Sequence, residues 1–131
     1  MNKHFSILLV LFLFILIMPA NAEVTWIPGK AGTGERLGLV NKPVTVDYLG
    51  ITRFRYAIQD NQGYRERSAA TPWCLDGKID LDYRHNPMIY KIPSWWAEVE
   101  DGVIFVEAES QVAIALLTDV CKAAKFTTKS H

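Results

Sequence analysis

An apolar run near the start dominates the hydropathy pattern of the chain. Positions 5–18 are apolar apart from one serine, Pro19 ends the run, and a small-x-small site, Ala-Asn-Ala, follows at 20–22. This arrangement, after a weakly basic start, is typical of a cleaved secretory signal peptide. A membrane anchor needs about 20 apolar residues, more than this run provides. We therefore expect residues 1–22 to be a signal peptide and residues 23–131 to form a single small domain, with no membrane span after cleavage.

Two segments in the middle of the chain alternate between apolar and polar residues, a pattern that predicts strands with one buried face. The first covers 52–58, and a turn at 60–63 leads into a second extended segment at 64–75. The Asp-Gly pair at 76–77 favours a two-residue hairpin turn, and alternation resumes at 79–83. We expect a hairpin around this turn.

Weaker signals predict further short strands. Within the glycine-rich segment 23–42, only 24–27 is predicted as a strand, and 44–48 is predicted to be extended. A second hairpin is expected from 96–99 to 103–106, because an Asp-Gly turn separates these two apolar segments.

The C-terminal part changes to a helical period. Apolar residues recur every four positions from Val112 to Ala124, with a second apolar row beside them, which predicts a helix over about 111–125. Ser110 stands where an N-cap is expected. The whole pattern predicts an α+β fold: a small antiparallel sheet with one C-terminal helix packed on it.

Both cysteines, Cys74 and Cys121, follow the predicted signal. An exported chain meets an oxidising environment, and two thiols allow one intramolecular pairing. Closing this loop would stabilise the fold by about 4 kcal/mol in the chain-entropy model. Two free thiols or a metal site are the alternatives, although two cysteines without neighbouring histidines are too few ligands for structural zinc. We expect a disulfide, and a location in the periplasm, at the cell surface or outside the cell.

Charge argues against a nucleic-acid partner. The chain has 14 basic and 14 acidic side chains, and only Lys3 would leave with the signal. No basic surplus remains to neutralise a run of phosphates.

The aromatic residues Trp73, Trp95, Trp96 and Tyr90 are the candidate binding residues. Such rings suit contacts with a glycan, a peptide or another protein. The alternative is that they fill the core of a small domain. Adjacent residues of one strand face opposite ways, so either Trp95 or Trp96 is expected to be exposed.

No constellation predicts catalysis, a cofactor or a metal site. His85 could act as a general base with Asp82 or Asp80 near it in sequence, but a hydrolase also needs a positioned nucleophile and an oxyanion site. Asp76, Asp80 and Asp82 alternate with apolar residues and therefore suit the solvated face of a strand better than a calcium loop. The glycine-rich segment 29–34 lacks the lysine and hydroxyl positions of a phosphate-binding loop.

Several features together resemble the surface-adhesin E type of small exported bacterial proteins. They are the signal, an early tryptophan, a Phe-Arg-Tyr strand at 54–56, Cys74 before a strand, and a helix that carries Cys-Lys at 121–122. The resemblance implies an α+β fold, a disulfide from a central strand to the last helix, no enzymatic activity, and binding to host or surface components. At 46–51 the chain lacks the serine that the family usually has, and no binding residues carry over.

These observations lead to one main functional hypothesis and two alternatives. The main one is a non-enzymatic, exported binding or envelope-accessory protein whose partner is a protein or a surface component. The alternatives are a secreted enzyme inhibitor, which would insert a loop carrying Trp95 and Trp96, and a small periplasmic hydrolase centred on His85.

Overall fold

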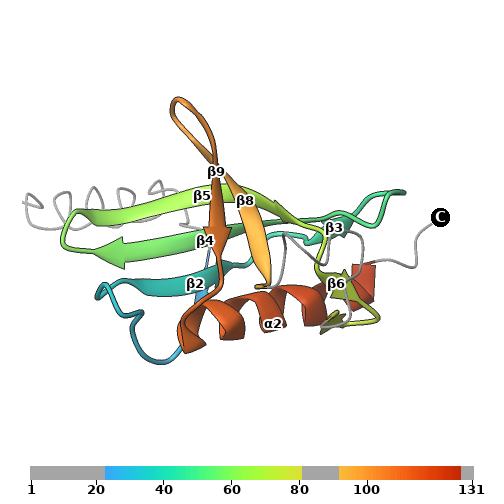
Figure 1. Ribbon diagram of the computed structural model, residues 1–131, viewed down its shortest axis with the longest axis horizontal. Coiled ribbons are helices and arrows are strands. Elements are labelled where there is room, and N and C mark those ends of the chain that lie inside the picture. Colours follow the sequence, from blue (N-terminus) through green and yellow to red (C-terminus); the bar gives the residue numbers. More distant parts are fainter. Residues whose placement is uncertain (1–22, 81–91, 128–131) are drawn as a thin grey trace, which may run out of the picture.

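The protein is a twisted antiparallel sheet with one long helix packed on one of its faces (Figure 1). The computed structural model describes residues 23–80 and 92–127, with side chains up to 124. The predicted signal peptide and the segment 81–91, which includes Tyr90 and His85, lie outside the described residues. The α+β architecture predicted from the sequence is confirmed.

Seven strands form the main sheet, in the order β1-β2-β4-β5-β8-β9, with β3 paired to the start of β4. A separate two-stranded hairpin, β6–β7, lies beside the end of the helix (Figure 1). The bounds are β1 (Val24–Trp26), β2 (Arg36–Val40), β3 (Thr45–Val46), β4 (Thr52–Asp60), β5 (Gly63–Thr71), β6 (Cys74–Leu75), β7 (Lys78–Ile79), β8 (Ser94–Val99), β9 (Gly102–Glu107) and α2 (Gln111–Thr127).

The hairpin of β4 and β5 forms the centre of the sheet, and its register follows the predicted alternation. Phe54, Tyr56 and Ile58 are buried against the helix side, while Arg53 and Arg55 point to the opposite, outer face. Period-two alternation turns successive side chains to opposite faces, so one strand supplies both the core and a polar surface.

Strand β2 was missed in the glycine-rich segment because a glycine interrupts its apolar pattern. Leu37 and Leu39 face the helix, whereas Gly38 lies on the outer face, where side chains of the paired strand β1 approach it closely. A Cβ atom added to Gly38 would lie 2.4 Å from Val24 Cγ1 and 3.0 Å from Trp26 Cε3. Only glycine allows β1 and its side chains to approach this closely.

The hairpin turn at Asp76 and Gly77 is confirmed, because both residues have the positive φ angles that such a turn requires, 53° and 79°. Its strands are shorter than predicted, with two residues on each side. The long strand ends at Thr71, since Pro72 has no N–H to donate to a ladder. The continuation predicted beyond Asp80 falls outside the described residues.

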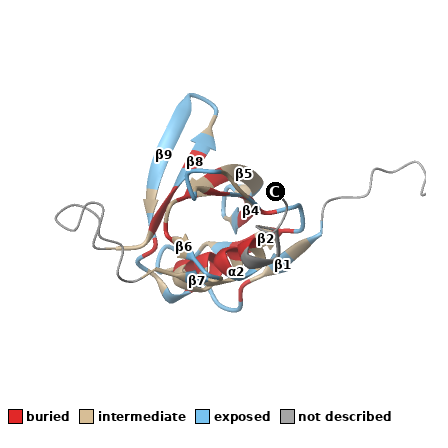
Figure 2. Cartoon of the chain, turned by 90° about the vertical axis from the view of Figure 1, so that its right-hand side faces the viewer, coloured by how far each residue is buried: buried red, intermediate tan, exposed pale blue. Residues whose placement is uncertain are grey.

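Helix α2 closes the core. Its apolar stripe is buried throughout, from Val112 to Ala124 (Figure 2). The Ala113 N–H donates to Ser110 Oγ at 3.0 Å, which confirms the predicted N-cap. The predicted disulfide is also present. It joins Cys74 of β6 to Cys121 on the apolar stripe of α2, with 5.0 Å between the two Cα atoms. The bond fixes the β6–β7 hairpin to the C-terminal half of the helix.

Candidate functional site

The hairpin of β8 and β9 projects from the body of the molecule, and we call residues 96–106 the arm. β8 pairs with β5 at only two positions, Ala69 with Ala97 and Ala70 with Trp96, so its distal half has no strand on that side. β9 pairs with β8 over six residue pairs and is the last strand of the sheet. Figure 2 shows the distal part of the arm projecting away from the helix and the central strands, and in Figure 1 its tip rises above the sheet.

The two adjacent tryptophans of β8 face opposite ways, as predicted. Trp95 is 1% exposed, and its ring packs edge-on against Tyr56 and Phe54, at centroid distances of 5.4 Å and 6.2 Å. Trp96 is 44% exposed, and its ring contacts that of Phe105 on β9, with 4.7 Å between the ring centroids. One strand therefore places one indole in the core and the next on the surface.

Two of the four candidate binding residues need correction. Trp73 and Trp95 are buried, at 3% and 1% exposure, and cannot meet a partner while the fold is intact. The reason for Trp73 is a specific internal contact: its Nε1–H donates to Ser94 Oγ at 3.2 Å. Trp95 and Trp96 lie in strand β8 and not in a loop. Tyr90 lies outside the described residues.

Sequence reasoning missed three exposed apolar residues of the arm. In β9, Val103 is 59% exposed, and Ile104 and Phe105 are each 38% exposed. The available signal was four consecutive apolar residues, Val-Ile-Phe-Val at 103–106, in place of alternation. A run of this kind means that both faces of the strand carry apolar side chains.

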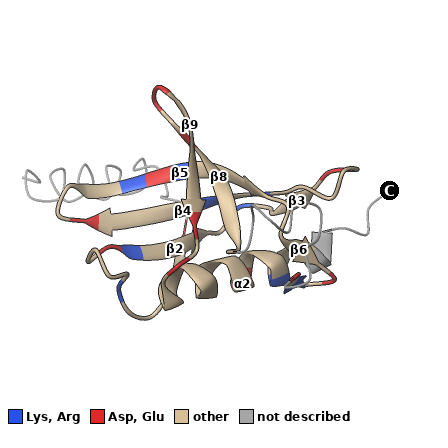
Figure 3. Ribbon diagram, viewed as in Figure 1, with Lys and Arg blue, Asp and Glu red and all other residues tan. Residues whose placement is uncertain are grey.

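The arm is also the most acidic part of the molecule. No lysine or arginine occurs between residues 92 and 121. Figure 3 shows acidic residues at the tip of the arm and at its base, whereas basic residues lie on β2, β4 and β5. The exposed acidic residues on and beside the arm are Glu98, Glu100, Asp101, Glu107 and Glu109.

A groove of about 730 Å³ runs along the outer face between the arm and the central hairpin. Trp96 and Val103 line one side, and Arg53, Arg55 and Ser68 line the other. The groove thus joins the exposed indole to a polar strand surface.

A hydrogen-bonded network holds the polar wall of this outer face in place. Arg55 donates from Nε to Glu66 at 2.9 Å and from Nη1 to Ser68 Oγ at 2.9 Å. The Tyr64 hydroxyl donates to the other oxygen of Glu66 at 2.5 Å. These bonds, that from Tyr64 first, lower the pKa of Glu66, and the bond to Glu66 raises the pKa of Tyr64 to about 12.

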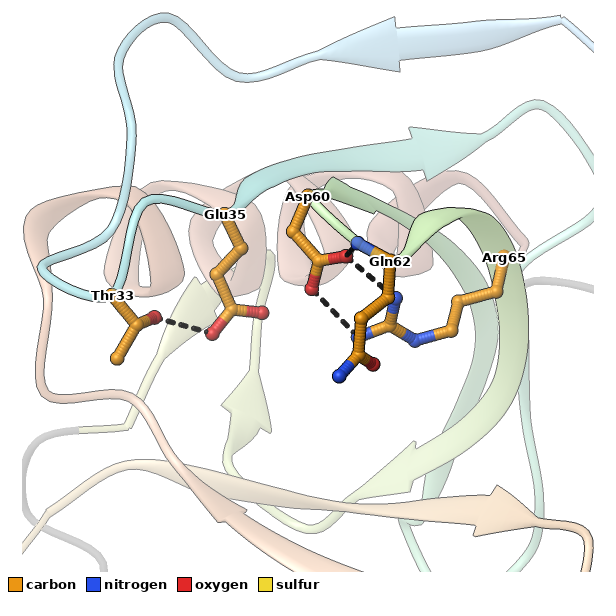
Figure 4. Close-up of polar contacts among 5 residues, drawn as sticks. All are labelled: Thr33, Glu35, Asp60, Gln62 and Arg65. Carbon is orange, nitrogen blue, oxygen red and sulfur yellow. Dashed lines mark hydrogen bonds and ion pairs between the residues drawn. The ribbon is translucent and has the colours of Figure 1, made fainter.

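A second polar cluster pins the loops at the other end of β4 and β5 (Figure 4). Arg65 donates two hydrogen bonds to Asp60, at 2.9 Å and 3.0 Å, and the Gln62 N–H donates to the same carboxylate at 2.9 Å. The bond from Arg65, then that from Gln62, lowers the pKa of Asp60. Across from it, the Thr33 hydroxyl donates to Glu35 at 2.7 Å. Asp60 and Arg65 satisfy each other and brace the β4–β5 turn.

The described residues contain neither a metal-ligand cluster nor a membrane-spanning helix. In 23–80 and 92–127, no three His, Cys, Asp or Glu residues lie close enough together to hold a metal ion. In the same part of the chain, no helix is both long enough and apolar enough to cross a membrane. The predicted general base, His85, lies outside these residues.

Comparisons of the chain with protein-family models, with curated proteins and with solved structures found no match. The resemblance to the surface-adhesin E type stays a prediction.

Proposed function

We propose that the protein is an exported, non-enzymatic binding protein that uses its arm to capture an extended segment of a partner protein. The segment has an apolar centre and basic residues at its ends. One observation carries this proposal: the last strand of the sheet, β9, exposes Val103 and Phe105 on the face that it shares with Trp96 of β8, and exposes Ile104 on its other face.

An exposed edge strand is a template for strand addition. Because antiparallel ladders bond alternate residues, half of the backbone groups of β9 point away from β8. Natural proteins usually protect such an edge with lysine, proline or a covering element, and β9 has neither residue among its six. Exposed apolar patches mark interaction sites, and strand addition combines backbone hydrogen bonds with side-chain contacts.

The charge of the arm favours a basic partner over a second copy of this chain. If two copies paired through β9 about a two-fold axis centred on 103–106, Gly102 of one copy would lie beside Glu107 of the other. Asp101 would then lie close to that glutamate at both ends of the pair. Like charges placed together across a strand pair are destabilising. A segment with lysine or arginine at its ends complements the same acids.

Export of the protein belongs to the same proposal. The predicted signal at 1–22 supports it, and the Cys74–Cys121 disulfide is compatible with it, since such bonds persist in oxidising compartments. A rigid scaffold behind the arm lowers the entropic cost of capturing a strand.

A peptide titration tests the proposal. The probe is Lys-Lys-Val-Thr-Val-Thr-Val-Lys-Lys, measured by calorimetry at low and high salt. Two control peptides keep its length: one has glutamate in place of every lysine, and one has proline in place of the central valine. We expect the basic peptide to bind, and both controls to bind at least about tenfold more weakly, a difference of about 1.4 kcal/mol. Equal binding of all three peptides, or no binding, would contradict the proposal.

A matched pair of variants places the contact on the arm. Val103→Lys puts a charge on the exposed edge, whereas Leu49→Lys puts the same charge on another exposed apolar residue, in the turn before β4. We expect Val103→Lys to weaken binding of the basic peptide about tenfold or more and Leu49→Lys to leave it unchanged. Light scattering of the free protein tests the alternative that β9 binds a second copy of this chain. A dimer that Val103→Lys abolishes would assign β9 to self-association instead.

A further inference from the structure

The outer groove has a shape that the register of the strands explains. Helix α2 packs on the inner face of the sheet only (Figure 1). On the outer face, cross-strand pairing places four side chains in one row over β3, β4, β5 and β8: Thr45, Arg53, Ala70 and Trp96. Long side chains stand on β4 and β8, whereas β5 between them lines the groove with serine and alanine only. The groove therefore has two walls and a low floor.

The width of the groove limits the size of its ligand. β4 and β8 are separated by two strand spacings, about 10 Å. The groove volume of about 730 Å³ lies within the range of small-molecule sites. A ligand that contacts both walls is therefore about as wide as one six-membered ring with its substituents.

Trp96 forms the apolar wall of the groove. It is 44% exposed, and its ring contacts that of Phe105 on β9. Trp96 lines the groove, while Phe105 is not among the described residues that do so, and the indole is thus exposed on the groove side of this pair. The face of an aromatic ring carries partial negative charge. It therefore attracts the C–H groups on the flat face of a pyranose sugar, whose hydrogens carry partial positive charge.

The opposite wall carries positive charge that the protein leaves partly unpaired. The side chain of Arg53 is 62% exposed, and its Nη2 lies 3.6 Å from Asp47 Oδ2, which is longer than a hydrogen bond. Lys42 is exposed and forms no ion pair with any described residue. Arg55 is already bonded across the strand pair, and Glu98 is the single acidic residue in the lining that the structure describes. The balance of charge favours an anionic group on the ligand.

Two hydroxyl groups lie between the apolar wall and the cationic wall. Thr45 and Ser68 both line the groove, and neither donates a hydrogen bond to a described residue, although Ser68 Oγ accepts one from Arg55. A free hydroxyl donor suits the hydroxyl and ring oxygens of a sugar. An acidic peptide could use the two cations, but its backbone offers no flat C–H face to Trp96. The three features together favour an acidic sugar.

We propose that the outer groove binds an acidic glycan built from hexuronate units. The flat face of one pyranose ring stacks on Trp96, its carboxylate meets Arg53 and Lys42, and its hydroxyl groups bond to Thr45 and Ser68. Arginine suits this role because its guanidinium can donate two parallel hydrogen bonds to one carboxylate. The glycan is bound and not transformed. The groove lies on the β5 side of the arm and not at the β9 edge, so this proposal does not rest on peptide capture.

Three probes test the proposal. Trigalacturonate carries the rings and the carboxylates, its full methyl ester keeps the rings without the charge, and triglutamate keeps the charge without the rings. Each is titrated at low salt into ¹⁵N-labelled protein with its disulfide intact, and the four tryptophan indole N–H signals are followed by NMR after assignment. We expect trigalacturonate to shift the Trp96 signal and to bind about fivefold more tightly than either of the other two probes.

An unmoved Trp96 signal at millimolar trigalacturonate would overturn the proposal, and so would equal binding of the acid and its ester. Binding of triglutamate as tight as that of trigalacturonate would overturn it in favour of an acidic peptide.

Variants of the two walls complete the test. Arg53→Gln is expected to weaken trigalacturonate binding about fivefold and to leave binding of the ester unchanged. Arg36→Gln is the matched control, since this exposed arginine of β2 does not line the groove. Trp96→Ala is expected to weaken binding of both saccharides about fivefold or more. Unchanged trigalacturonate binding in Arg53→Gln or in Trp96→Ala would overturn the proposal. Arg53→Gln should not affect the basic peptide, which separates this test from that of the arm.

Discussion

The two long hairpins of this sheet have the same antiparallel architecture and opposite surfaces. In β4–β5, the inner face is apolar and buried, while the outer face carries paired charges such as Arg55 with Glu66. In β8–β9, the inner face is buried only near Trp95, and the distal half exposes Val103, Ile104 and Phe105. In β4–β5, charged side chains on the outer face pair with each other across the strands. In β8–β9, apolar side chains remain exposed to water.

The difference indicates a division of labour. Burial of apolar surface stabilises a fold by about 25 cal/mol per Å², and the exposed parts of the side chains at 103–105 gain none of this in the free protein. The central hairpin, the helix and the disulfide stabilise the fold without the distal arm. The arm is therefore free to carry a surface suited to contact with another molecule.

The largest expected effect separates the two tryptophans of β8. Trp95→Ala removes a fully buried ring from the core and is expected to lower the free energy of unfolding by about 3–5 kcal/mol. Trp96→Ala removes a half-exposed ring and is expected to cost about 1 kcal/mol or less. Chemical denaturation of both variants measures the difference, and equal losses would remove the distinction between core and arm.

The disulfide is expected to have the next largest effect. Replacing Cys74 and Cys121 together with alanine releases a constraint between positions 47 residues apart. The chain-entropy model assigns about 4 kcal/mol to such a loop. We expect a lower melting temperature and an unchanged exposure of the arm, measured by quenching of tryptophan fluorescence with a soluble quencher, to which Trp96 is the most accessible tryptophan. A variant as stable as the wild type would show that the bond does not hold α2 to the β6–β7 hairpin.

The smallest effect concerns the charges of the central hairpin. Because Tyr64 and Arg55 lower the pKa of Glu66 in the folded state, the ionised carboxylate stabilises the fold above its ordinary pKa of 4.5. This contribution is lost as the pH falls through the lowered folded pKa. We expect Glu66→Gln to be slightly less stable than the wild type at pH 7, and the gap to close in acid. Denaturation midpoints from pH 7 down to pH 3 measure it, and a gap that widened in acid would refute the assignment.

The elements that follow a regular apolar period or a local capping rule were predicted correctly from the sequence, and the strand whose apolar period is interrupted was missed. The stripe of α2, the Ser110 cap and the alternation of β4 follow local rules, and all were predicted correctly. β2 was missed because Gly38 interrupts its apolar pattern. The reason for this glycine is the close approach of β1, a contact between separate segments that the local pattern does not show.

The candidate site was only partly predictable for the same reason. A strand forces Trp95 and Trp96 to opposite faces, but local pattern cannot say which face the helix covers. The burial of Trp73 follows from its bond to Ser94, which is distant in sequence. The arm depends on β8 leaving β5 after two paired positions, and this separation has no local sequence signal.

Hydrogen exchange along β9 tests the central claim, which is that this edge accepts a strand. Amides of β9 that point away from β8 are expected to exchange rapidly in the free protein and to become protected when Lys-Lys-Val-Thr-Val-Thr-Val-Lys-Lys is added. Amides of the β4–β5 hairpin should not change. Binding of the peptide without new protection in residues 102–107, or with protection elsewhere, would contradict the account.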